Sequence, residues 1–285
     1  MVIISTGALC LFIWIYLLAA HGGFWRLAGL TDPRRSGQAR PASVAVVVPA
    51  RNEADVVGLC LASLLQQASG NAIHVYLVDD GSTDCTAQVA QEAARGAGQA
   101  SLTVIAGKPI AAGWSGKLWA VQQGIEKALA QQPDYLLLTD ADILHGPENI
   151  STLIQIAEDG SYDLVSFMVK LHCRTLAEKL LIPAFVFFFL KLYPPAWIAD
   201  PHRRTAGAAG GCILIRPEAL ARAGGIESIR GEIIDDCALA NRVKRSGGRI
   251  WLGLTTKTQS IRPYGSFREI GRMISRAAFN QLHHS

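Results

Sequence analysis

The chain has 285 residues, which is enough for one large α/β domain with small additions and too few for several full domains. Half of the residues are hydrophobic, the mean hydropathy is +0.23, and the net charge is only +4 with the basic residues scattered, so nucleic acid is not an expected partner. The six cysteines are irregularly spaced without a CxxC pair, which argues against a disulfide framework or a zinc site and favours a reducing compartment.

An uncharged, mostly apolar run opens the chain at residues 2–20, and its nineteen residues are about what a bilayer-spanning helix needs. A cleaved signal peptide is the alternative, but no Lys or Arg precedes the run. Four arginines follow it: Arg26, Arg34, Arg35 and Arg40. By the positive-inside tendency we expect a transmembrane anchor over residues 1–24, a linker over 25–43, and the rest of the chain on the cytoplasmic side of the inner membrane.

Strand-like and helix-like segments alternate from residue 44 onward. Short apolar runs predict buried strands at 44–48, 73–78, 102–105 and 135–139. Helices are predicted at 54–67, 86–97, 115–132 and from Pro147 onward. Two further strands are expected at 163–167 and 212–215. The alternation predicts an α/β domain over residues 44–262, with a mostly parallel sheet and helices on both faces.

Two helical segments in the second half carry much of the remaining apolar surface. Leu180–Leu190 is almost wholly apolar between Lys179 and Lys191, and eleven residues are too few to span a bilayer as a helix. A buried core helix and an interfacial helix both remain open for it. Residues 263–285 are predicted to form an amphipathic interfacial helix. Its basic residues recur at four-residue spacing, namely Arg268, Arg272 and Arg276.

Polar clusters follow three of the predicted strands, at the point where each strand ends. The clusters are Pro49-Ala50-Arg51-Asn52-Glu53, Asp79-Asp80-Gly81-Ser82-Thr83-Asp84 and Asp140-Ala141-Asp142. Open parallel sheets bind ligands at the carboxyl ends of their strands. Each cluster alone could be turn chemistry or a helix cap. The coincidence of all three at strand ends predicts a functional rim.

The residue types of this rim suggest a metal and a diphosphate. Bare carboxylates would repel a nucleotide diphosphate, so they make sense if they hold a divalent cation between the protein and the phosphates. In Asp140-x-Asp142, one carboxylate can bind the metal while the other meets the ribose or an ordered water. Such a metal stabilises the charge that develops on a leaving diphosphate. We therefore expect Mg²⁺ or Mn²⁺ at Asp140 and Asp142, with Asp142 as the direct ligand.

The three clusters together resemble those of the family 2 glycosyltransferases, which have the GT-A fold. The resemblance covers roughly residues 43–262 and implies that the first two clusters cradle the nucleotide while the Asp-x-Asp binds the metal. Three segments are more closely similar to the hopanoid-biosynthesis-associated branch, namely Gly113–Ala120, Ala208–Cys212 and Ile234–Leu239. The donor-binding residues so implied are Pro49, Ala50, Arg51, Glu53, Asp79, Asp80, Lys117 and Asp140.

Two motifs in the rest of the chain add to this set. Lys117 follows a glycine at the start of a predicted helix, where it could meet a phosphate or simply lie on the surface. Asp235 and Asp236 precede the helical stretch Cys237–Val243, where one of them could be only a helix cap. The resemblance implies that Asp236 is the catalytic base, with Asp235 in place of the family's usual Glu. Adjacent carboxylates can also raise one another's pKa, which suits a base.

The sequence thus predicts an inverting, metal-dependent glycosyltransferase. It would move a sugar from a nucleotide-diphosphate donor to a lipid-like acceptor at the cytoplasmic membrane face. One alternative is a nucleotidyltransferase of similar fold, although Pro49–Glu53 lacks the glycines such enzymes usually carry. Another is a non-catalytic, truncated membrane protein that binds nucleotide sugars.

The end of the sequence bears on both the product and the anchoring. Of the Gln-x-x-Arg-Trp motif of processive family members, only Arg276 is present, which argues against a long-polymer synthase. Close relatives would usually continue beyond Ser285 into further membrane helices, so we expect either a truncated copy or one with reduced anchoring.

Overall fold

Hydrophobic strands form the centre of the molecule, which a computed structural model describes except at residues 1, 32–39, 68–69, 96–100, 233–234 and 282–285. The strands are β1 (Ser43–Ala50), β2 (Ala72–Asp79), β3 (Ser101–Ala106), β4 (Tyr135–Leu138), β5 (Ile143–Leu144), β6 (Leu164–Lys170), β7 (Ile213–Ile215) and β8 (Ile250–Ser260). They form one sheet in the order β3-β2-β1-β4-β7-β6-β8-β5. Strands β1 to β4 pair in parallel, whereas β7 is antiparallel to both β4 and β6.

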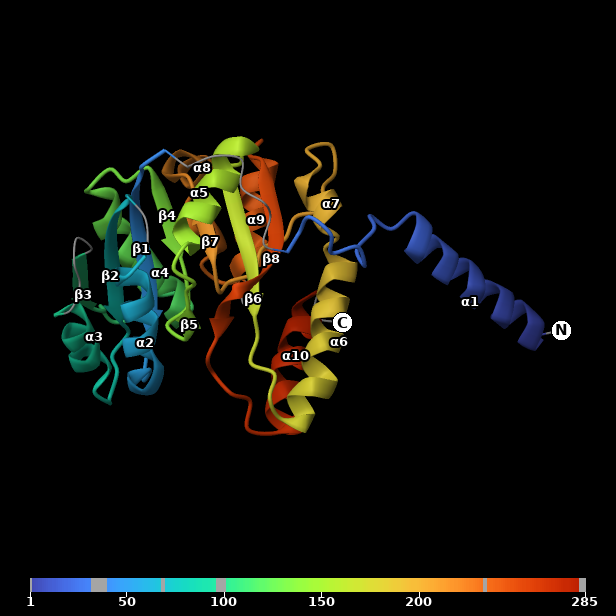
Figure 1. Cartoon of the computed structure of the whole chain (residues 1–285), viewed down its shortest axis with the longest axis horizontal. Helices are drawn as coiled ribbons and strands as arrows, with labels where there is room; N and C mark the ends of the chain where they lie inside the picture. Colours follow the sequence, from blue (N-terminus) through green and yellow to red (C-terminus); the bar gives the residue numbers. More distant parts are fainter. Residues whose placement is uncertain (1, 32–39, 68–69, 96–100, 233–234, 282–285) are drawn as a thin grey trace.

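Helices cover both faces of this sheet, as predicted (Figure 1). Their bounds are α1 (Val2–Ala19), α2 (Ala54–Leu65), α3 (Thr86–Ala94), α4 (Gly116–Leu129), α5 (Asn149–Asp159), α6 (Leu176–Leu192), α7 (Pro195–Ala199), α8 (Pro217–Arg222), α9 (Asp235–Arg245) and α10 (Phe267–Gln281). Side chains of a strand alternate between the faces. In β1, Ala45 and Val47 pack with α4 and α9, while Val46 and Val48 pack with α2 and α5.

Most of the expected elements are present, with small shifts at their ends. Helix α4 begins where predicted, because the Ser115 side chain accepts a hydrogen bond from the Leu118 N–H. Helix α5 begins two residues after Pro147. The predictions for Arg34, Arg35 and Ile234, and for the last residues of the C-terminal helix, lie outside the described residues, as does the side chain of Arg276.

A close approach between α4 and β1 fixes the height of α4 over the sheet. A Cβ atom at Gly124 would lie 2.5 Å from Cγ1 of Val47, so a larger residue would push the helix outward. The first turn of α4, in which Lys117 is the second residue, lies at the carboxyl edge of the sheet.

The helix that contains the apolar stretch Leu180–Leu190 is longer than this stretch. Helix α6 starts at Leu176, because Thr175 and Glu178 form a reciprocal capping box. Lys179 and Lys191 therefore lie within the helix and do not mark its ends. Together with α7, the stretch Leu176–Ala199 is long and apolar enough to cross a membrane by length and composition, and 33% of its most apolar window is buried.

Helix α1 is apolar on all sides and projects away from the rest of the molecule (Figure 1). Its large side chains are exposed, for example Ile3 at 87% and Phe12 at 70%. At 18 residues it is shorter than the Leu176–Ala199 stretch. An apolar helix with its large side chains exposed needs a membrane or a partner to cover it. The transmembrane anchor stays a prediction.

Helix α10 is formed as predicted, and its buried side packs on α6. Ile270 is fully buried beside Ala177 and Ile182, with Met273 and Ile274 at the margin. The apolar side of α10 thus has a protein partner in this structure. Its interfacial role stays a prediction.

The carboxylate of Glu178 ties the start of α6 to the segment that leads into α10. It is fully buried and accepts hydrogen bonds from the N–H groups of Arg174, Thr175 and Tyr264, at 2.8, 2.8 and 2.9 Å. Nδ1 of His172 lies 2.7 Å away. Burial alone would raise the pKa of Glu178, but these partners lower it well below its usual range.

We expect Glu178→Gln to lower the midpoint of thermal unfolding by at least about 3 °C, because one acceptor oxygen becomes a donor facing other donors. Since the pKa is depressed in the folded state, this stabilisation should be present near neutral pH and lost as the pH falls through the folded pKa. Circular dichroism melts of the variant and of Glu126→Gln, an exposed glutamate on α4, provide the comparison. Equal melts for both variants would contradict the proposed role of Glu178.

Candidate active site

The carboxyl ends of β1, β2 and β4 meet at one edge of the sheet, as the sequence predicted. Ala50 is opposite Asp79 across β1 and β2, and Val47 is opposite Leu138 across β1 and β4. The three polar clusters therefore follow neighbouring strands on the same side. The parallel pairing is what brings residues 49–53, 79–84 and 140–142 together.

A cavity of about 630 Å³ opens at this edge. It is lined by Pro49, Ala50, Arg51, Glu53, Asp80, Gly116, Lys117, Ala120, Asp140, Ala141, Asp142 and Arg262. All but one of the predicted donor-binding residues are in this set. The exception is Asp79, whose carboxylate accepts a hydrogen bond from the Ser82 N–H at 2.9 Å within its own turn.

Hydrogen bonds between the first two clusters hold the mouth of this cavity. Asn52 has a left-handed backbone (φ 54°), and its side-chain oxygen accepts a hydrogen bond from the Thr83 N–H at 2.8 Å. The Ser82 hydroxyl in turn accepts one from the Asn52 N–H at 3.0 Å. Beside them, Arg51 lies 3.6 Å from Asp80. The turn residues thus have a structural task, while Arg51 and Asp80 face the cavity.

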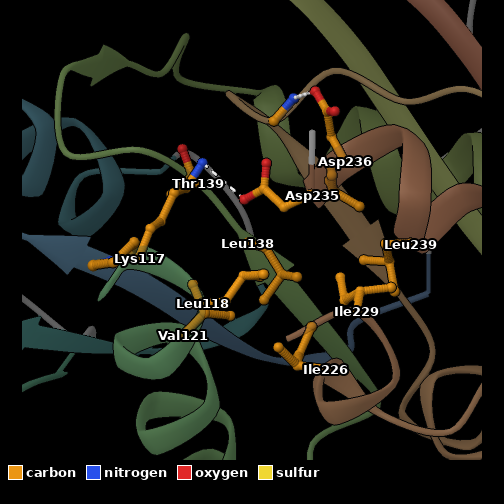
Figure 2. Close-up of a pocket in the computed structure, with 13 residues that line it drawn as sticks. Lys117, Leu118, Val121, Leu138, Thr139, Ile226, Ile229, Asp235, Asp236 and Leu239 are labelled. Carbon is orange, nitrogen blue, oxygen red and sulfur yellow. Dashed lines mark hydrogen bonds and ion pairs between the residues drawn. The ribbon is translucent and has the colours of Figure 1, made fainter. Parts of the chain in front are cut away.

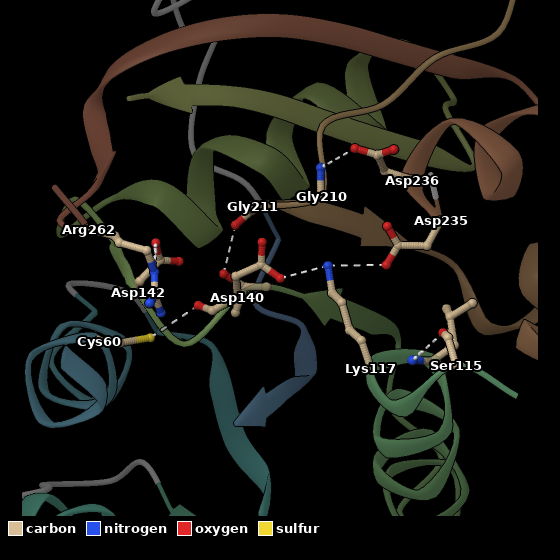
Figure 3. A network of polar contacts seen from close by, with 12 residues as sticks. Cys60, Ser115, Lys117, Asp140, Asp142, Gly210, Gly211, Asp235, Asp236 and Arg262 are labelled. Atoms are coloured by element: carbon tan, nitrogen blue, oxygen red, sulfur yellow. Dashed lines mark hydrogen bonds and ion pairs between the residues drawn. The ribbon is translucent and has the colours of Figure 1, made fainter. Parts of the chain in front are cut away.

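Lys117 joins the two halves of the site (Figure 3). Its Nζ lies 2.9 Å from Oδ1 of Asp140, after β4, and 3.1 Å from Oδ2 of Asp235, at the start of α9. Burial would lower the pKa of Lys117, but the charges of Asp140 and Asp235 outweigh it and raise the pKa, so the amine is charged. Burial raises the pKa of Asp140, and the contact with Lys117 opposes this. Asp140 is thus bound to a cation of the protein itself.

Asp236 lies beside this bridge, above an apolar floor (Figure 2). Its Oδ2 accepts a hydrogen bond from the Gly210 N–H at 2.8 Å, and its Oδ1 accepts one from the Cys237 N–H at 2.7 Å. Burial, followed by the charge of Asp235, raises the pKa of Asp236 to about 6. The floor consists of Leu118, Val121, Leu138, Ile226, Ile229 and Leu239. A carboxylate with a raised pKa in such a position can accept a proton near neutral pH.

Asp142 is held by two residues that the sequence reasoning missed. Its Oδ2 accepts a hydrogen bond from the Ser260 hydroxyl at 2.9 Å and lies 3.4 Å from Nε of Arg262. Arg262 also forms an ion pair with Glu53, whose pKa is raised mainly by burial. Ser260 ends β8, an 11-residue strand that was not predicted. The Leu- and Thr-rich run Ile250–Ser260 was the signal that could have located it.

A buried polar network supports the residue before Asp140. The Thr139 hydroxyl donates to the Gly211 carbonyl at 2.7 Å and lies 3.0 Å from Nε2 of His145. Nδ1 of His145 lies 2.9 Å from Asn149, whose carbonyl oxygen accepts a hydrogen bond from Thr258. Burial lowers the pKa of His145 to about 3, so the ring is neutral. The end of β4 is therefore rigidly placed.

Asp140 and Asp142 offer two carboxylates to a divalent cation. These residues fit such a cation only if a bound ligand supplies further oxygen atoms. Over the part of the chain that the structure describes, no group of three or more His, Cys, Asp or Glu side chains could hold a metal. Mg²⁺ and Mn²⁺ sites of nucleotide enzymes often use one or two carboxylates and complete their shell with phosphate oxygens and water. The contacts described for the Asp142 carboxylate all fall on Oδ2. Asp140 and Asp142 fit that pattern.

Comparison with known proteins adds the following. A family model described as "Glycosyltransferase like family 2" matches residues 41–275. An undecaprenyl-phosphate 4-deoxy-4-formamido-L-arabinose transferase of Pseudomonas aeruginosa (strain LESB58) is 34% identical over 128 residues, which is 43% of this chain and 34% of that protein. The chain thus spans about a third of the length of the curated relatives it matches.

Two solved structures share the fold at low sequence identity. The mannosyltransferase PcManGT from Pyrobaculum calidifontis, in complex with GDP-Man and Mn²⁺, has a TM-score of 0.60 and 20% identity, covering 95% of this chain and 73% of that one. S. aureus TarS 1–349, in complex with UDP-GlcNAc, has a TM-score of 0.52 and 15% identity, covering 84% and 67%.

Proposed function

Because the chain belongs to glycosyltransferase family 2 and has the GT-A fold, we propose that it transfers a sugar from a nucleotide-diphosphate donor to a lipid-like acceptor at the cytoplasmic face of the inner membrane. The observation that carries this proposal is the Lys117 bridge. It joins Asp140, on the wall of the large cavity, to Asp235, next to the proposed base. The donor diphosphate and the acceptor hydroxyl would therefore bind next to each other.

The large cavity is the proposed donor site. Pro49, Ala50, Arg51, Glu53 and Asp80 would contact the nucleotide, and Asp79 would act only through its turn. Lys117 would donate to a phosphate oxygen, since its ammonium group faces the cavity. Asp142, with Asp140, would hold Mg²⁺ or Mn²⁺, which when bound neutralises charge on the departing diphosphate. The nucleotide sugars bound in the two structural neighbours support the choice of a nucleotide sugar as donor.

Asp236 is the proposed base of an inverting transfer. The acceptor oxygen would attack the anomeric carbon from the face opposite the diphosphate, while Asp236 takes its proton. This assignment favours an acceptor with a hydroxyl group. A lipid phosphate is already ionised near neutral pH, so it needs no base and would be repelled by Asp235 and Asp236.

The lipid character of the acceptor rests on two observations. Helix α1 and one side of α6 expose apolar side chains, and the curated relatives are named for undecaprenyl phosphate. The relatives' names support the lipid class only, and a hydroxylated lipid of hopanoid biosynthesis is the acceptor to test, because of the three segments similar to that branch. Such a lipid is a membrane component, which fits a chain held at the bilayer.

A thermal-shift panel of nucleotide sugars tests the donor site. With Mg²⁺ or Mn²⁺ present, we expect one GDP- or UDP-sugar to stabilise the protein, by about 2.7 kcal/mol at one hundred times its Kd. The shift should shrink when EDTA removes the metal, because the diphosphate would then face bare carboxylates. Nucleoside monophosphates serve as the control. The absence of a shift with every nucleotide sugar would contradict the proposed function.

A further inference from the structure

A second, strongly basic cavity lies away from the active site. It has a volume of about 460 Å³ and is lined by Pro201, His202, Arg203, Arg204, Asn241, Lys244 and Arg245. No carboxylate is among these lining residues. Arg245 is nine residues beyond Asp236 on α9, which is about 14 Å along a helix. The cavity is therefore separate from the place where the acceptor would react.

Lys244 gives this cavity a rigid wall. Its Nζ donates hydrogen bonds to the carbonyls of Trp197, Ile198 and Thr205, at 3.0, 2.7 and 2.7 Å. The ammonium group thus fastens the loop after α7 to α9. Arg203, Arg204 and Arg245 are exposed and carry the charge that the cavity offers to a ligand. Only a long contact of 3.8 Å joins Arg203 to Asp200.

The same loop is packed against the base of α1. Arg203 lies over the Trp197 ring at 4.6 Å, and the Trp197 ring also contacts the His21 ring, with centroids 4.6 Å apart. Nε2 of His21 lies 2.8 Å from the Lys191 carbonyl, at the end of α6. The chain that leaves α1 is therefore docked on the α6–α7 junction (Figure 1). It is next to the basic cavity, because Arg203, which lines that cavity, lies over the same Trp197 ring.

The elements that lead to the cavity expose apolar and aromatic side chains. Apolar α1 projects outward, and α6 exposes Leu180 and Phe188 at 58% and 55%. Trp25, 45% exposed, follows α1 with Arg26 over its ring. The basic cavity adjoins the same segment through Arg203 and Trp197. Apolar, aromatic and basic side chains occur close together where a protein enters a bilayer.

We propose that this cavity binds the phosphate of an anionic membrane lipid, which fixes the orientation of the domain on the bilayer. The proposal rests on the membrane placement in the proposed function. Guanidinium groups match phosphate in a planar, two-pronged geometry, and three of them face one cavity here. A lipid is the source because the exposed apolar helix ends beside the cavity.

Native mass spectrometry of the full chain in neutral detergent tests the proposal. Phosphatidylglycerol should remain bound, and phosphatidylcholine should not. Arg203→Gln, Arg204→Gln and Arg245→Gln together should weaken phosphatidylglycerol binding about a hundredfold, from the loss of three charges. The matched control removes three exposed charges elsewhere, through Arg95→Gln, Lys127→Gln and Lys257→Gln, and should bind as the unchanged protein does.

Further outcomes separate the alternatives. Equal phosphatidylglycerol binding by both triple variants would overturn the proposal. Displacement of the lipid by an equal concentration of inorganic phosphate would also overturn it, since the site would then take free phosphate. The cavity variant should keep its melting temperature and its thermal shift with nucleotide sugars. Loss of that shift in the unchanged protein would defeat the proposed function while leaving the lipid result standing.

Discussion

Replacing Asp236 with Asn is expected to lower kcat by about 10²- to 10⁴-fold, the usual contribution of a positioned general base. The amide keeps the shape of the carboxylate but cannot accept the acceptor's proton. Donor binding should survive, because Asp236 lies outside the lining of the large cavity. Transfer to a lipid extract and thermal shift with nucleotide sugars measure the two effects separately.

The pH profile makes this test sharper. Burial and the charge of Asp235 raise the pKa of Asp236 to about 6, and the base works only when deprotonated. For a hydroxyl acceptor, kcat/KM should therefore fall as the pH drops through about 6, and the residual activity of Asp236→Asn should lack this fall. Asp55→Asn, an exposed residue of α2, is the matched control. Full activity of Asp236→Asn would remove the residue from the mechanism and favour an ionised acceptor.

The second large effect is expected at Asp142. Asp142→Asn should abolish transfer and remove the metal-dependent part of the thermal shift, because a neutral amide is a poor ligand for a hard divalent cation. The fold should be kept, since Asn can still accept a hydrogen bond from Ser260.

The Asp142→Asn result can be checked against two comparisons. Titration of Mn²⁺ into the variant and into Asp55→Asn, each with the same nucleotide sugar, gives the metal affinity. If Asp142→Asn keeps the metal response of the control, Asp142 is not the metal ligand, and Asp140 would have to act alone.

Local patterns were enough to predict the first half of the fold. The strand at 44–48 contains only apolar residues, which predicts that both of its faces are buried. The polar cluster that starts at Pro49 marks its end. Once β1, β2 and β4 were expected to be parallel, the gathering of Asp80, Asp140 and Asp142 at one edge followed. The structure places them around one cavity.

Contacts between distant segments could not be predicted in this way. Lys117 meets Asp235 across 118 residues of chain, and no local signal distinguishes this contact from a surface lysine. Arg262 was missed because β8 was missed. That strand pairs with β6, more than 80 residues earlier, and its register shifts between Met168 and Lys170. Helix α6 extends beyond the apolar stretch 180–190 at both ends, because a capping box sets its start and Lys191 lies inside its last turn.

The pairing of β8 also determines at which stage of synthesis the active site can be completed. Strands β1 to β4 lie within residues 43–138, so a nascent chain can assemble that part of the sheet early in synthesis. Asp142 contacts Ser260 only when a loop of 118 residues closes. Closing this loop costs conformational entropy of the chain. A ribosome-bound intermediate would thus hold its aspartates at the sheet edge without Ser260 and Arg262. Asp142 therefore reaches its final geometry only when Ser260 and Arg262 have emerged.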